Sequence, residues 1–142
     1  MRILGLDIGE KRIGIAISDP LGWTAQGHSV LHRQDLDTDL RHIKEIYKEF
    51  KVDKIVLGLP RNMNGSLGAK ALEIQEFGEL LAGKLAAEVE YWDERLSTQS
   101  AERILIEADV SRRRRKQVID KLAAVNILQG YLDYLASGPR RI

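Results

Sequence analysis

The chain has 142 residues, of which 22 are basic and 21 acidic, so its net charge of +1 indicates no particular class of partner. The absence of cysteine excludes disulfides, thiolate metal sites and a cysteine nucleophile. No apolar run approaches the roughly 20 residues that cross a bilayer, and Asp7 interrupts the N-terminal apolar stretch too early for a signal peptide. We therefore expect a cytoplasmic protein, without a membrane partner, that folds as one domain over residues 1–142.

The N-terminal third begins with a predicted β-hairpin. Residues 3–7 and 13–18 are apolar and partly β-branched, and a turn containing Gly9 separates them. A short third strand is expected near 29–31. Apolar residues three and four positions apart then predict a helix over 36–50, which Asp35 or Asp37 would cap.

The rest of the chain alternates predicted strands and helices. Strands are expected at 54–57 and 89–92, and helices at about 67–85, 97–107 and 118–135. The residues expected to be buried are Leu72, Phe77, Leu81 and Leu85 in the first of these helices and Leu122, Val125, Leu128, Leu132 and Leu135 in the last. Antiparallel leading strands followed by strand–helix alternation predict an α/β fold, a mixed sheet covered by helices.

Two acidic residues stand at the ends of predicted strands. Asp7 closes a buried strand, where a carboxylate is costly unless a cation or hydrogen-bond donors meet it; the alternative is a turn-forming Asp before glycine. Glu94 lies just past strand 89–92, on the same side as Trp92 if the alternation continues. Because that strand can end or bulge there, the pattern alone does not choose between Glu94 and Asp93.

A third acid, Asp120, lies in the first turn of the last predicted helix. The helix dipole favours an anion at that position, which by itself explains the residue. However, Asp120 shares a helix flank with Ala123 and Ala124, whose small side chains would let the helix approach the sheet closely. We therefore expect that Asp120 reaches Asp7.

Asp7, Glu94 and Asp120 together suggest a metal site. Two bare carboxylates about 4 Å apart repel by roughly 4 kcal/mol at an effective dielectric constant of about 20, so a gathered trio calls for a cation. Oxygen-only ligands suit Mg²⁺ or Mn²⁺, and the sequence offers no Cys or His set for zinc. We therefore hypothesise that these three acids are both the metal ligands and the catalytic residues.

Basic and amide side chains lie near each proposed ligand. Charge runs are usually just solvated, but the run at 111–116 precedes an acidic site that would otherwise repel nucleic acid, so phosphate neutralisation is a useful role for it. It has no base-reading signature, and recognition of shape or backbone is expected. The predicted substrate-binding residues are Lys11, Arg12, Arg61, Asn62, Asn64, Arg95, Arg112, Arg113, Arg114 and Arg115.

Four motifs in this order resemble those of the YqgF-type family of Holliday junction resolvases, which is also regarded as the nuclease that matures pre-16S ribosomal RNA. They are GLDIGEKRIG at 5–14, GLP and NMNG at 58–60 and 62–65, DERLST at 93–98, and Asp120 with AA at 123–124 and IL at 127–128. The resemblance spans nearly the whole chain. One departure is Glu10, where relatives often carry Ser or Thr; its role is left open.

The resemblance implies a ribonuclease H-like nuclease domain with a five-stranded mixed sheet and helices on both faces. It also implies a divalent-metal site at Asp7, Glu94 and Asp120, with Glu94 preferred and Asp93 in reserve. The implied activity is metal-dependent phosphodiester cleavage of structured nucleic acid, in 5′-end maturation of pre-16S rRNA or, alternatively, in Holliday junction resolution. The expected partners are pre-rRNA or branched DNA and the ribosome, for a monomer or weak homodimer.

Two rival functions start from the same residues. An actin-like or sugar-kinase ATPase also uses an Asp-x-Gly turn after its first strand, but it needs two related lobes, for which 142 residues leave no room. A catalytically silent RNA-binding module would have no need of the three acids. Magnesium-dependent cleavage separates the nuclease from the silent module.

Overall fold

The computed structural model describes residues 1–96 and 112–137, without the side chains of Arg95 and of residues 112–117. The elements in chain order are β1 (Ile3–Ile8), β2 (Arg12–Ser18), β3 (Ala25–His32), α1 (Leu36–Glu49), β4 (Lys54–Leu59), α2 (Ala69–Leu85), β5 (Glu88–Asp93), η1 (Glu94–Leu96) and α4 (Arg112–Ser137). The helix predicted at 97–107 lies outside the described residues.

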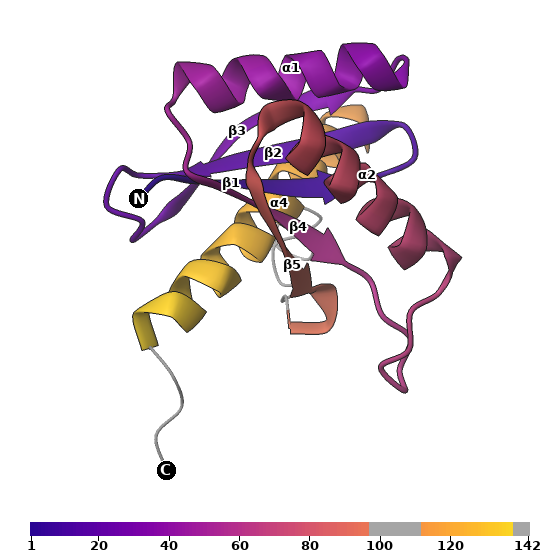
Figure 1. Cartoon of the computed structure of the whole chain (residues 1–142). Coiled ribbons are helices and arrows are strands. Elements are labelled where there is room, and N and C mark those ends of the chain that lie inside the picture. Colours follow the sequence, from indigo (N-terminus) through magenta and orange to yellow (C-terminus); the bar gives the residue numbers. More distant parts are fainter. Residues whose placement is uncertain (97–111, 138–142) are drawn as a thin grey trace.

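The strands form one five-stranded mixed sheet in the order β3-β2-β1-β4-β5. Pairing is antiparallel from β1 to β2 and from β2 to β3, and parallel from β1 to β4 and from β4 to β5. Helices α1 and α2 lie on one face of the sheet and α4 on the other (Figure 1). The predicted mixed sheet with antiparallel leading strands and helices on both faces is confirmed.

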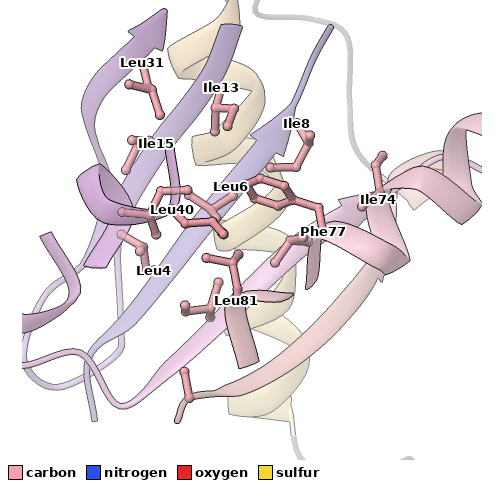
Figure 2. Packing of buried hydrophobic residues seen from close by; sticks show 14 of the residues in the cluster. Leu4, Leu6, Ile8, Ile13, Ile15, Leu31, Leu40, Ile74, Phe77 and Leu81 are labelled. Carbon is pink, nitrogen blue, oxygen red and sulfur yellow. The ribbon is translucent and has the colours of Figure 1, made fainter. Parts of the chain in front are cut away.

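Strand alternation divides the interior into two apolar layers. On the α1 and α2 face, Leu4, Leu6 and Ile8 of β1 pack with residues such as Leu40 and Phe77 (Figure 2). The α4 face is smaller and contains Ile3, Ala16, Val56, Ala124, Ile127, Leu128, Tyr131 and Leu132. Because Asp7 alternates with Leu6 and Ile8, it belongs to the α4 face.

Several predicted boundaries and faces were wrong. β3 spans Ala25–His32 instead of 29–31, because its whole length pairs with β2 although its composition is polar. α4 begins at Arg112, six residues earlier than predicted. Leu72 and Leu135 are 51% and 44% exposed. In α2 the predicted residues Phe77 and Leu81 are buried, and the small residues Ala71 and Gly78 complete the buried face in place of Leu72.

The N-terminus of α1 has the predicted cap. The Asp35 carboxylate accepts hydrogen bonds from the backbone nitrogen and the hydroxyl of Thr38, at 2.8 Å each. Asp35 is therefore the cap, and Asp37 lies in the first turn. Among the described residues, no helix combines the length and apolar character that a membrane span requires.

Candidate active site

The carboxyl ends of three parallel strands, β1, β4 and β5, meet at one edge of the sheet. Asp7 is the second-last residue of β1, and Glu94 follows β5 directly. β4 lies between these two strands, and neighbouring strands are about 4.8 Å apart, so Glu94 must cross the width of β4 to reach Asp7. The small residue that permits this crossing is Gly58.

Gly58 of β4 has no side chain at the point where Glu94 passes. A Cβ there would lie 2.7 Å from Glu94 Oε1 and would also overlap the side chain of Ile127 in α4. Glu94 and Asp7 share a side-chain hydrogen bond. Asp93 points elsewhere and faces the guanidinium of Arg61, with 3.8 Å between Oδ2 and Nε. Of the two adjacent acids, Glu94 is therefore the one that meets Asp7.

The Asp7–Glu94 pair is removed from water. Burial raises the pKa of Asp7, and the negative charge of Asp120 adds to this effect, while the hydrogen bond with Glu94 opposes it. Burial also raises the pKa of Glu94, to about 7, and the charge of Asp7 is the second cause. Below about pH 7, Glu94 therefore holds the shared proton and donates it in the hydrogen bond to the Asp7 carboxylate.

Helix α4 brings Asp120 to the same edge because of a second glycine. Gly14 of β2 lies directly opposite Asp7 in the β1–β2 ladder. A Cβ on Gly14 would overlap the backbone oxygen of Asp120, so the helix can approach this closely only where the side chain is absent. The helix does approach the sheet closely, as predicted from the small residues Ala123 and Ala124. The approach also depends on the strand residue Gly14, which faces Asp120 and the fully buried Ala124.

The side chain of Asp120 is held by Arg12. Arg12 Nε donates to Asp120 Oδ2 at 2.5 Å, and the two side chains are 22% and 24% exposed. In the described part of the chain, no three acidic, histidine or cysteine side chains are arranged to hold a metal ion together. The structure thus brings Asp7 and Glu94 into contact, with Asp120 close to them but bound to a cation of the chain. The three-ligand site stays a prediction.

The loop after β4 uses its own polar side chains for internal hydrogen bonds. Asn62 Nδ2 donates to Ser66 Oγ at 3.0 Å, and Asn64 Oδ1 accepts from the Ser66 backbone nitrogen at 3.0 Å. Arg61 donates to the carbonyl of Gly65 at 2.9 Å. These contacts define the shape of a loop next to the acidic pair. Substrate binding by Arg61, Asn62 and Asn64 stays a prediction.

The remaining predicted cations occupy two places. Lys11 is exposed in the β1–β2 turn beside Arg12. The backbone of 112–115 begins α4, about two helical turns before Asp120, so the arginine run and this acid share one helix. The side chains of Arg95 and of Arg112, Arg113, Arg114 and Arg115 lie outside the described part, and their role stays a prediction.

Two basic residues near the acids were not predicted from the sequence. Lys70, in the first turn of α2, lies close enough for its charge to lower the pKa of both Asp7 and Glu94. Arg33 donates to the carbonyl of Gly9 at 2.8 Å and faces the buried carboxylate of Asp39 at 3.5 Å, which braces the β1–β2 turn. The sequence held one signal for the contact between Arg33 and Asp39, because Asp39 lies beside the apolar face of a predicted helix.

Known proteins share this sequence and fold. The family model described as "RuvX: Holliday junction resolvase" matches residues 1–134. A protein of Syntrophomonas wolfei named "Putative pre-16S rRNA nuclease" is 65% identical over 94% of both chains. One of the same name from Clostridium tetani is 55% identical over 94% of this chain and 96% of its own.

Solved structures of low sequence identity share the architecture. RuvC of T. thermophilus, solved in complex with a Holliday junction substrate, superposes with a TM-score of 0.61 at 14% identity, covering 97% of both chains. The fowlpox virus Holliday junction resolvase gives 0.54 at 14% identity, covering 94% of this chain and 99% of its own. The fold is therefore the predicted ribonuclease H-like resolvase fold. On the family match and the near-complete relatives, the chain belongs to the RuvX family of nucleases, enzymes that hydrolyse ester bonds in nucleic acids.

Proposed function

We propose that the chain is a magnesium-dependent endonuclease of structured nucleic acid, working as one domain, and that its substrate is precursor 16S ribosomal RNA. The observation that carries this proposal is the contact between Asp7 of β1 and Glu94, which directly follows β5; a glycine in β4 allows the two acids to meet. Burying two carboxyls against each other is unfavourable unless the pair is neutralised. A structural role alone gives no reason for that cost.

The residues at this edge fit a divalent cation. Asp7 and Glu94 offer oxygen ligands only, in a desolvated setting where they now share a proton. Hard cations such as Mg²⁺ or Mn²⁺ prefer such ligands, and a cation there would replace the proton and relieve the repulsion. Asp120, whose backbone already lies beside Asp7, is the proposed third ligand once its side chain leaves Arg12.

Each residue then has a distinct task in cleavage. Divalent cations in nuclease sites activate a water molecule and neutralise charge on the leaving oxygen. Asp7 and Glu94 would hold the cation, and Glu94 would have to give up its proton to do so. Lys70, Lys11 and Arg12 add positive charge around the acids, where the phosphates of a nucleic acid have to be accommodated.

The choice of precursor rRNA follows the name of the relatives that are 52–65% identical. The second candidate is Holliday junction resolution, which is favoured by the description of the family model and by the likeness to RuvC. Paired cuts across a junction require two active sites on a symmetric dimer. We propose a monomer or weak dimer that acts in the cytoplasm on ribosome-associated precursor, so that strong dimerisation would favour the junction.

The decisive experiment compares both substrates with the same preparation of protein. Precursor 16S rRNA and a four-way DNA junction are incubated with the chain in Mg²⁺, and the products are mapped. The proposal expects cuts near the 5′ end of the mature rRNA, and none after Asp7→Asn, while Asp37→Asn, an exposed acid in the first turn of α1, serves as the matched control. If only the junction is cleaved, the substrate is branched DNA and not precursor rRNA. Full activity of Asp7→Asn would exclude the proposed site.

A further inference from the structure

The ion pair between Arg12 and Asp120 joins two residues to which the proposed function gives different partners. Arg12 is the first residue of β2, just after the turn that follows Asp7. Asp120 belongs to α4, which packs against the N-terminal strands β1, β2 and β3. Arg12 Nε and Asp120 Oδ2 are 2.5 Å apart. While this contact lasts, the carboxylate cannot serve a metal with the same oxygen, and the guanidinium is not fully available to a phosphate.

The backbones of both residues are fixed, so only the side chains can exchange partners. The carbonyl of Arg12 accepts from the Gly9 backbone nitrogen at 2.8 Å, which closes the turn. The backbone of Asp120 rests on Gly14, the cross-strand partner of Asp7. The Asp120 carboxylate also lies close enough to Asp7 for its charge to act on that residue, so the exchange requires no movement of the backbone.

A pocket lies beside the Arg12–Asp120 pair. It has a volume of about 330 Å³ and is lined by Gly9, Glu10, Lys11, Arg12 and Asp120. Two cations and the backbone of a glycine turn are suitable partners for a phosphodiester group. The Asp120 and Glu10 carboxylates are the unfavourable members of this lining, and withdrawal of Asp120 towards a metal would remove one of them.

We infer that Arg12 couples the two binding events of the site. Without metal, Arg12 neutralises Asp120; when a divalent cation takes Asp120 together with Asp7 and Glu94, Arg12 turns to a substrate phosphate in the pocket of residues 9–12. This inference rests on the proposed function. By reciprocity, the metal then strengthens nucleic-acid binding and nucleic acid strengthens metal binding.

The exposure of the pair suits such an exchange. Both side chains are about one-quarter exposed, and ion pairs with solvent access contribute little to stability. A fully buried pair would be costly to break, because each charge would remain without a partner. Arg12 and Asp120 can therefore separate when each gains a new partner.

The test is a titration with Mn²⁺ alone, in which electron paramagnetic resonance measures the free ion. Arg12→Gln is compared with Lys11→Gln, which removes the same charge from the same turn but leaves the Asp120 contact intact. Arg12→Gln is expected to bind Mn²⁺ roughly fivefold more tightly than Lys11→Gln, because the competitor for Asp120 is gone. In an Asp120→Asn background the two variants are expected to bind equally. If Arg12→Gln does not fold, Arg12→Lys, whose contact is weaker, is expected to show a smaller gain.

A second measurement follows the phosphate side. The affinity for a fluorescein-labelled hairpin RNA is measured by stopped-flow anisotropy, before cleavage, with and without Mn²⁺. The metal is expected to raise RNA affinity more in the wild type than in Arg12→Gln. Equal Mn²⁺ binding by Arg12→Gln and Lys11→Gln, or equal enhancement of RNA binding, would overturn the inference alone. Failure of every variant to bind Mn²⁺ would overturn it together with the proposed metal site.

Discussion

The backbone oxygen of Asp120 occupies the space in which a side chain on Gly14 would lie. Since Gly14 pairs with Asp7 across the β1–β2 ladder, the absence of one Cβ decides how near the C-terminal helix comes to the acidic pair. Backbone atoms cannot swing aside as the end of a long side chain can. The position of α4 on the sheet is therefore sensitive to a single methyl group.

Gly14→Ala is expected to destabilise the protein by about 1–3 kcal/mol, because the helix must move away from the sheet to avoid the overlap. Urea unfolding measures this change. Gly83→Ala is the matched control, since a Cβ at this exposed position in α2 meets nothing within 4 Å; it is expected to stabilise the helix by about 0.5–1 kcal/mol. Equal stabilities of the two variants would contradict the close approach.

Gly58→Ala tests the crossing of Glu94 over β4. The new Cβ would lie 2.7 Å from Glu94 Oε1, so the Glu94 carboxylate has to leave Asp7. We expect cleavage to fall at least tenfold, whereas RNA binding in the absence of metal changes little. A rate assay in Mg²⁺ and an anisotropy titration in EDTA check the two parts, and wild-type cleavage by Gly58→Ala would refute the assigned path of Glu94.

The stability of the metal-free protein is expected to fall as the pH rises. The pKa of Glu94 is raised from 4.5 to about 7 in the folded chain, so between these values the folded state binds more protons than the unfolded state. The stabilisation is full below about pH 4.5 and is lost as the pH rises through about 7. The raised pKa of Asp7 acts in the same direction.

Glu94→Gln is expected to lose the part of this pH dependence that Glu94 contributes and to be more stable than the wild type above about pH 7. Thermal unfolding in EDTA across this range measures the difference. The control is Glu45→Gln, an exposed acid of α1. Parallel curves for the wild type and Glu94→Gln would show that the Asp7–Glu94 pair is not desolvated.

Removal of Arg33 is expected to loosen the β1–β2 turn. Its guanidinium donates to the Gly9 carbonyl at 2.8 Å and faces Asp39, a carboxylate that is 1% exposed. Arg33→Gln leaves that charge buried without its cation, at an expected cost of about 1–3 kcal/mol in urea unfolding. The control is Arg41→Gln, which removes an exposed cation on the same side of the sheet. An equal loss of unfolding free energy in the two variants would show that Arg33 does not brace the turn.

The strand pattern was sufficient to predict the face of Asp7, but it did not decide which of the two acids at the end of β5 would meet it. Asp7 alternates with Leu6 and Ile8, and Glu94 continues the side of Trp92, so both lie on the α4 face. This works because the side-chain direction in a strand has a period of two residues and needs no tertiary information. The strand glycines that bring α4 close were visible in the sequence, but which helix atom faces each one depends on the packed fold.

Two contacts between distant segments were not predicted from the sequence. Arg12 and Asp120 are 108 positions apart, and both were assigned to outside partners, a phosphate and a metal, when in the structure they bind each other. Lys70 belongs to no motif, and its place near the acids follows from the loop that sets the start of α2. Side-chain partners of this kind are decided by tertiary packing, which local periodicity does not encode.

The central claim is that Asp7 and Glu94 hold a divalent cation together with Asp120, and anomalous diffraction from crystals soaked in Mn²⁺ tests it most directly. One anomalous peak or two are expected where the carboxyl ends of β1, β4 and β5 meet, at roughly 2.0–2.2 Å from oxygens of Asp7 and Glu94. The Asp120 carboxylate should have turned from Arg12 towards the peak. A peak only at other sites, at Mn²⁺ concentrations that support cleavage, would contradict the account.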